Sequence, residues 1–110
     1  MGGKNSLEIE KNKAFLRLKK TLTLSNLWIY ILSLAKKQRI YAYSLDKEIE
    51  KNFSFKPSQL WVYLVLYKLE NDGLLVSKQE NNRRYYSITK KGTRLLEEGK
   101  KFIKNTLNLI

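Results

Sequence analysis

Apolar residues recur at helical spacing through the first third of the chain. Several of them stand among lysines near the N-terminus and predict a helix over residues 7–20. A nearly continuous apolar run follows Ser25, which is expected to cap a helix over 26–35 at the centre of the core. The segment 39–42 is short and rich in strand-forming residues, so it predicts a minor strand or a bend.

Two further helices, separated by a tight turn, are predicted in the middle of the chain. Apolar residues four apart among charged ones predict a short amphipathic helix over 43–52. Pro57 disfavours helix at the residue before it, and Ser58 can then cap a helix over 59–71 that stops at Gly73. The expected core positions of this last helix are Val62, Leu66 and Leu69.

The last third of the chain predicts a β-hairpin followed by a helix. Residues 74–79 and 83–88 have the composition of strands, with a turn at 80–82. Thr89 can cap a final helix whose spacing suits packing along another helix. Its apolar positions are Leu95, Leu96, Phe102, Ile103 and Leu107.

The order helix, helix, tight turn, helix and hairpin is that of a winged helix-turn-helix. We therefore expect an α+β, mostly helical fold made of an N-terminal helical arm (1–24), a winged-helix domain (25–89) and a C-terminal dimerisation helix (90–110). The terminal helices carry more apolar surface than one small domain can bury, which favours a homodimer over a monomer with a frayed tail. The expected interface residues are Phe15, Leu18, Leu96, Ile103 and Leu107.

Composition narrows the function. The chain has 110 residues, enough for one domain, and 43% of them are hydrophobic. Without an apolar run of membrane-spanning length or a signal peptide, we expect a cytoplasmic, nucleoid-associated protein with no membrane partner. The absence of cysteine and histidine removes the usual zinc ligands and the Ser-His and Cys-His pairs, so we expect no enzyme, no metal and no cofactor.

Charge points to a polyanionic partner. There are 22 lysines and arginines against 10 acidic residues, a formal net charge of +12. Such an excess attracts nucleic acid, although a solvated lysine-rich surface would give the same composition. The order of elements favours double-stranded DNA.

The third helix of the domain would enter the major groove with its N-terminal residues toward the base edges. The expected DNA contacts from this helix and its approach are Lys56, Ser58, Gln59, Trp61, Tyr63 and Lys68. Gln59 can pair with adenine through two hydrogen bonds, whereas Ser58 either contacts a phosphate or serves only as the cap. Trp61 is either a packing residue or an apolar contact to a thymine methyl group or sugar.

The hairpin tip supplies Asn82, Arg83 and Arg84, which suit phosphates or a narrow minor groove. The alternative is an exposed turn whose arginines point into solvent. Tyr85 and Tyr86 alternate along the returning strand, so one of them is expected to pack on the core.

Two motifs resemble the PadR-like family of transcriptional regulators over residues 26–96. They are Tyr63-Leu64-Val65-Leu66-Tyr67-Lys68-Leu69-Glu70-Asn71-Asp72-Gly73-Leu74 and Arg83-Arg84-Tyr85-Tyr86-Ser87-Ile88-Thr89-Lys90-Lys91-Gly92. The chain departs from the family pattern at Ala42, where glycine is usual, and at Gln59-Leu60-Trp61, where proline, glycine and serine or threonine are usual. The resemblance implies a dimer, a palindromic operator and repression relieved by a ligand. Trp28 is then either a core residue or part of a ligand pocket.

The sequence leaves three functions open. A sequence-specific homodimeric regulator, acting as a repressor, fits all of the signals. A non-specific architectural DNA-binding protein would need only the charge, and a protein-interaction adaptor could use the same fold.

Overall fold

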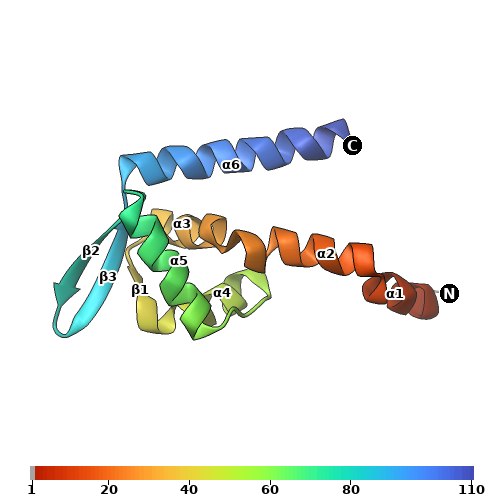
Figure 1. Cartoon of the computed structure of the whole chain (residues 1–110), viewed down its shortest axis with the longest axis horizontal. Helices are drawn as coiled ribbons and strands as arrows, with labels where there is room; N and C mark the ends of the chain where they lie inside the picture. Colours follow the sequence, from red (N-terminus) through yellow and green to blue (C-terminus); the bar gives the residue numbers. More distant parts are fainter. Residues whose placement is uncertain (1) are drawn as a thin grey trace.

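The computed structural model describes residues 2–110, and their side chains from Leu7 onward. A small three-stranded sheet lies at one edge of the helical domain, and its hairpin of residues 75–88 projects outward (Figure 1). The predicted α+β, mostly helical winged-helix fold is confirmed. In chain order the elements are α1 (Gly2–Lys11), α2 (Lys13–Leu22), η1 (Leu24–Asn26), α3 (Leu27–Lys37), β1 (Ile40–Tyr41), η2 (Ala42–Ser44), α4 (Leu45–Phe53), α5 (Gln59–Asn71), β2 (Leu75–Glu80), β3 (Arg83–Ile88) and α6 (Lys90–Leu109).

The core lies where α3, α4 and α5 meet the sheet and the first half of α6. Helix α3 contacts α4, α5, α6 and β3, which explains why its sequence is apolar on nearly every side. Burying one such side chain contributes about 1.5–3 kcal/mol. The most deeply buried side chains are Leu27, Ile31, Leu32, Leu45, Ile49, Val62, Leu66, Leu75 and Leu96.

Strand β3 is the middle strand of an antiparallel sheet with the order β1-β3-β2. Ile40 pairs with Tyr86 on one side of β3, which confirms the minor strand predicted near residue 40. The alternation along β3 buries Tyr86 on the core side and leaves Tyr85 half-buried on the other side. The prediction that one of the two tyrosines packs on the core is therefore confirmed.

The N-terminal region is helical, but the single helix predicted over 7–20 is wrong. Asn12 separates α1 from α2, and its side-chain oxygen accepts hydrogen bonds from the backbone N–H groups of Ala14 and Phe15 at 2.9 and 3.2 Å. Asparagine is among the best N-cap residues, so the chain starts a second helix here instead of continuing the first.

Ser25 does not cap α3 as predicted. It lies inside the short 3₁₀ helix η1, and α3 begins two residues later. Asn26 occupies the cap position, but its side chain bonds elsewhere: it donates to the Thr21 carbonyl at 2.6 Å and accepts from the indole N–H of Trp28 at 3.3 Å. The arm is thereby tied to α3.

Helix α6 begins where predicted and extends beyond the core. The Thr89 hydroxyl oxygen accepts from the backbone N–H of Gly92 at 3.0 Å, which confirms the cap. Figure 1 shows the second half of α6 and the α1–α2 arm extending from the domain. The radius of gyration is 16.1 Å, against about 13 Å for a compact chain of this length. Within residues 2–110, no helix is both long and apolar enough to cross a membrane.

Candidate nucleic-acid interface

The turn between α4 and α5 brings the first turn of α5 to the surface. Ser54 ends α4 in the left-handed conformation, with φ of 65°, and Pro57 is buried beneath the turn. The Ser58 hydroxyl oxygen accepts from the backbone N–H of Trp61 at 3.1 Å, so the predicted cap is confirmed. Residues 58–61 are all exposed.

Gln59 is the first residue of α5. Its Nε2 atom donates a hydrogen bond to the backbone carbonyl of Tyr43 at 3.2 Å. Because the amide nitrogen carries two hydrogens, this bond leaves one donor and the amide oxygen for an adenine edge. The base contact of Gln59 stays a prediction.

The outward face of α5 is apolar and aromatic. Leu60, Leu64 and Tyr67 follow one another at helical spacing, opposite the buried stripe that the sequence predicted, and we call them the outer stripe. Tyr63, one of the predicted DNA contacts, lies exposed beside this stripe on α5. The sequence analysis missed the outer stripe, although its spacing relative to the core stripe is readable from the sequence alone.

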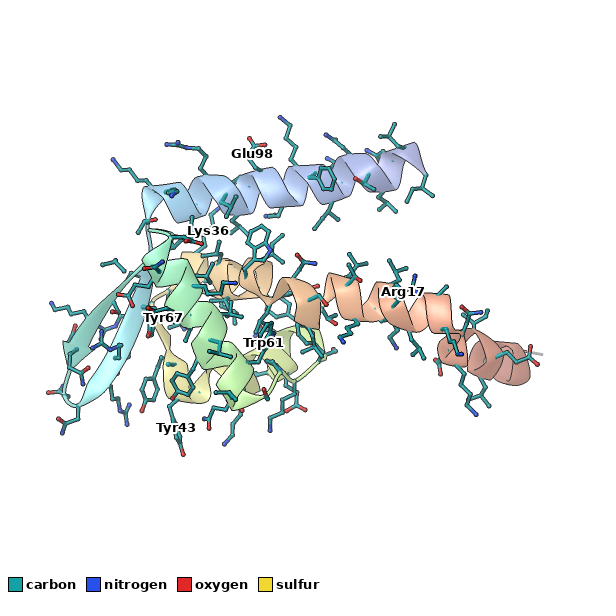
Figure 2. All side chains as sticks on the ribbon, viewed as in Figure 1. Arg17, Lys36, Tyr43, Trp61, Tyr67 and Glu98 are labelled. Carbon is teal, nitrogen blue, oxygen red and sulfur yellow. The ribbon has the colours of Figure 1, made fainter. Side chains whose placement is uncertain are left out.

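Trp61 and Lys68 lie on a different flank of α5. The indole N–H of Trp61 donates to the Leu24 carbonyl at 3.0 Å, so Trp61 holds α5 against the junction of α2 and α3 (Figure 2). Trp61 and Lys68 both line a groove of about 330 Å³ shared with Leu95 of α6. This position favours the packing alternative for Trp61, but the side chain is also 41% exposed, so its DNA contact stays a prediction.

Two lysines flank the start of α5. Lys56 from the turn and Lys20 from α2 line a groove of about 490 Å³ together with Ser58. Lys56 was predicted as a DNA contact, and the structure places it on the exposed surface beside the first turn of α5. Lys20 was missed because its position depends on how the arm packs against the domain.

The hairpin β2–β3 forms the wing. Asn81 and Asn82 both have positive φ, 49° and 64°, as in a type I′ turn, which matches the twist of the flanking strands. Arg83 and Arg84 follow directly and are exposed. Successive side chains on a strand point to opposite faces, so Arg83 and Arg84 lie on opposite faces of the wing.

Arg83 lies on the face of the wing that carries the half-buried rings of Tyr41 and Tyr85. Its guanidinium carbon is 5.0 Å from the centre of the Tyr41 ring. On the same face, Arg39 lies 4.0 Å from the Tyr85 ring and pairs with Glu80 at 2.8 Å. Stacked cations of this kind keep their charge at the surface in a fixed place. The sequence analysis missed Arg39 and Tyr41, which meet the wing only because β1 pairs with β3.

Arg84 faces α5 and braces the wing against it. Its guanidinium donates to the Ser77 hydroxyl at 2.7 Å, and that hydroxyl donates to the Glu70 carboxylate of α5 at 2.5 Å. The backbone N–H of Ser77 also donates to Glu70, at 3.2 Å. Beside this network, burial and then the Glu70 charge raise the pKa of the Tyr86 hydroxyl. Arg84 is therefore a bracing residue as well as an exposed cation.

A continuous series of contacts places the start of α5 and the wing on one side of the molecule. Gln59 bonds to Tyr43, the Tyr43 ring lies 6.1 Å from the Tyr41 ring, and Arg83 lies over Tyr41. Figure 2 shows Tyr43 directed away from the domain at the end of α5. A duplex that met the first turn of α5 would therefore also meet Arg83.

Trp28 is half-buried between the core and a surface groove. Together with Gly99 and Phe102 it lines a groove of about 390 Å³ between α3 and α6. Trp28 therefore packs against the core, as one alternative predicted, and it also lines a groove, as the other required. Ligand binding at Trp28 stays a prediction.

The residues predicted for a dimer interface divide into two groups. Leu18, Ile103 and Leu107 are exposed on the extended parts of α2 and α6, and Phe15 is half-buried. Leu96 is only 2% exposed, because α6 packs it into the core of its own domain. The expectation that Leu96 belongs to an uncovered stripe is wrong.

The arrangement of α4, the turn, α5 and the wing defines a winged-helix protein. Residues 31–98 match the model of the transcriptional regulator PadR-like family. The chain therefore belongs to the PadR-like family of transcriptional regulators, which confirms the resemblance found in the sequence. This family consists of transcriptional regulators.

Solved structures agree with this assignment. A PadR family transcription regulator from hypervirulent Clostridium difficile is 30% identical, with a TM-score of 0.65 over 74% of this chain and 94% of that chain. A PadR family regulator from Eggerthella lenta is 24% identical, with a TM-score of 0.71 over 88% and 92%. A winged-helix DNA-binding protein from STIV is also 24% identical, with a TM-score of 0.65 over 74% and 90%. The last two likenesses show the fold alone. A comparison with curated proteins gives no match.

Proposed function

We propose that this protein binds specific sites on double-stranded DNA as a homodimer and represses transcription. The observation that carries the proposal is the series of contacts from Gln59 through Tyr43 and Tyr41 to Arg83. It aligns a helix that fits the major groove with a cation that can reach the phosphates. The net charge of +12 supplies long-range attraction to such a partner.

Exposed apolar surface on the terminal helices supports the dimer. Ile103 and Leu107 of α6 and Leu18 of α2 are exposed in the single chain, on parts that extend beyond the core. A twofold dimer that covered them would present two copies of α5 about 34 Å apart, the spacing of adjacent major grooves. Repression would follow if such a site overlapped a promoter, and the protein would then reside on the nucleoid.

Selection of bound duplexes from a random pool tests the proposal. We expect a palindromic site with half-sites about one helical turn apart and an affinity at least about 10³-fold above that for random duplex. Equal affinity for all sequences would favour the architectural alternative. Failure to bind any duplex at low salt would overturn DNA binding and favour the adaptor.

A further inference from the structure

The outer stripe of α5 is apolar where a helix would meet the floor of the major groove. Leu60 and Tyr67 are each 71% exposed and Leu64 is 47% exposed. A contiguous apolar patch in the middle of a basic surface indicates a partner that covers it. The chemistry of that partner can be derived from what surrounds the stripe.

Cations lie on both sides of the outer stripe. Lys20 and Lys56 gather beside the start of α5 on one flank, and Arg83 is held by the Tyr41 ring on the other, where the charge of Arg39 is already paired with Glu80. The matching partner has two rows of anions with an apolar strip between them. The major groove has this form, because phosphates line both rims and the thymine C5-methyl group is the apolar group on its floor.

We propose that Leu60 and Leu64 read thymine methyl groups in the major groove, with the Tyr67 ring extending the contact. This inference rests on the proposed function, since it names the feature of DNA that α5 recognises. Residues four apart on a helix lie about 5–6 Å apart, and base pairs stack every 3.4 Å or so, so the two leucines can reach methyl groups on neighbouring pairs. Gln59, at the start of the same helix, suits the adenine of such a pair.

Replacing thymine by deoxyuridine tests the proposal, because this change removes the methyl group and keeps every hydrogen-bonding group. The full-length protein is titrated with one A·T-rich duplex in its thymine and its deoxyuridine form. The expected loss of affinity is roughly fourfold for each methyl group that a leucine covers. The variant Leu60→Ala/Leu64→Ala should bind both forms equally, at about the affinity of wild type for the deoxyuridine form.

Ile9→Ala is the matched control, because Ile9 is an exposed apolar residue on α1, outside both α5 and the wing. This variant should keep the wild-type preference for thymine. Circular dichroism checks that each variant is folded, and single substitutions at Leu60 and Leu64 serve if the double variant is not. Full cytosine-to-5-methylcytosine exchange in a second duplex should raise the affinity of wild type but not that of the leucine variant.

The outcomes separate this inference from the proposed function. Salt-sensitive wild-type binding that is equal for thymine and deoxyuridine would overturn the methyl contact and leave DNA binding intact. A thymine preference that persists in the leucine variant would also overturn it, since the methyl groups would then act through the shape of the DNA. No binding to either duplex would overturn the proposed function itself.

Discussion

The guanidinium group of Arg83 lies over the ring of Tyr41, with 5.0 Å between its central carbon and the ring centre. Tyr41 is fixed in turn, because β1 pairs with β3 and places it opposite Tyr85. A cation–π contact at an exposed site contributes about 0.5–1 kcal/mol, enough to favour one position for a flexible side chain. The wing therefore presents Arg83 in a fixed place on the side where Gln59 begins α5.

Arg83→Ala is expected to weaken binding to every duplex. Each phosphate contact that is lost makes the negative slope of log K against log salt less steep by about 0.9, because fewer counterions are released. Titrations at several salt concentrations measure the slope. Lys104→Ala is the control, since it removes the same charge from the exposed end of α6. Equal slopes for the two variants would contradict a phosphate contact by Arg83.

Glu70→Ala should loosen the wing. The substitution removes the carboxylate that accepts hydrogen bonds from the Ser77 hydroxyl and backbone N–H. Arg84, which bonds to the same hydroxyl, also loses the negative charge near its guanidinium group. Each of these bonds contributes on the order of 1 kcal/mol in a partly buried setting. Urea unfolding should show a loss of about 1–2 kcal/mol.

Glu98→Ala is the control for that loss, because it removes an exposed carboxylate on α6 (Figure 2). Its effect should stay within about 0.5 kcal/mol. If Glu70→Ala were as mild as Glu98→Ala, the brace between α5 and the wing would have no energetic importance.

The elements that sequence predicted well are those fixed by local chemistry. Ser58 and Thr89 cap their helices because a hydroxyl one residue before a helix bonds the free N–H groups of its first turn. Residues 83–88 alternate as a strand, and Gly73 ends α5 with φ of 76°. Asn12 gave a comparable local signal, but the apolar spacing on both sides of it favoured one continuous helix.

The features that sequence could not predict depend on segments far apart in the chain. Leu96 looked like part of an exposed stripe until the fold placed it against the core. The hydrogen bond from Trp61 to the Leu24 carbonyl was also out of reach of the sequence, because it depends on how α5 packs against a distant segment. Arg39 joins the wing for the same reason, because it needs the pairing of β1 with β3.

The stability of the protein should fall in alkaline solution in part through Tyr86. Burial raises the pKa of its hydroxyl above the ordinary value of 10.0 in the folded state. The folded state therefore favours the neutral form of Tyr86. The contribution of this preference to the free energy of unfolding is fully present below pH 10.0 and is lost as the pH rises through the raised pKa.

Tyr86→Phe removes this group, so the free energy of unfolding of the variant should fall less steeply with pH above 10.0 than that of wild type. Burial also raises the pKa of the Tyr30 hydroxyl, so the free energy of unfolding of the variant should keep part of its dependence on pH. Tyr67→Phe, at an exposed position on α5, is the control and should follow wild type. Parallel curves for Tyr86→Phe and wild type in urea unfolding would show that Tyr86 does not contribute.

Ile103→Glu should break the proposed dimer and leave the fold intact. Ile103 is exposed in the single chain, so the new carboxylate faces water in a monomer but would be buried and unpaired in a dimer. Sedimentation velocity should give a dimer for wild type and a monomer for the variant. Asn105→Glu adds the same charge on the other side of α6 and should stay dimeric. A wild-type monomer at micromolar concentration would contradict the dimer.

Gly92 and Gly73 should differ in their tolerance of alanine. A Cβ atom at Gly92 would lie 2.2 Å from the Leu74 carbonyl oxygen and 2.8 Å from Cγ1 of Ile88. Since one of these is a backbone atom, α6 must move away from the sheet. The loss should reach about 3 kcal/mol, even after a gain of about 1 kcal/mol in helix propensity.

At Gly73 the nearest atom to an added Cβ, Cδ of Lys91, is 4.0 Å away, so only the positive φ of 76° opposes alanine. This strain costs roughly 1–2 kcal/mol. Urea unfolding of both variants should therefore rank Gly92→Ala as the less stable. The reverse order would mean that α6 is free to shift at its first turn, and that the contact between Gly92 and Leu74 does not fix its start against the wing.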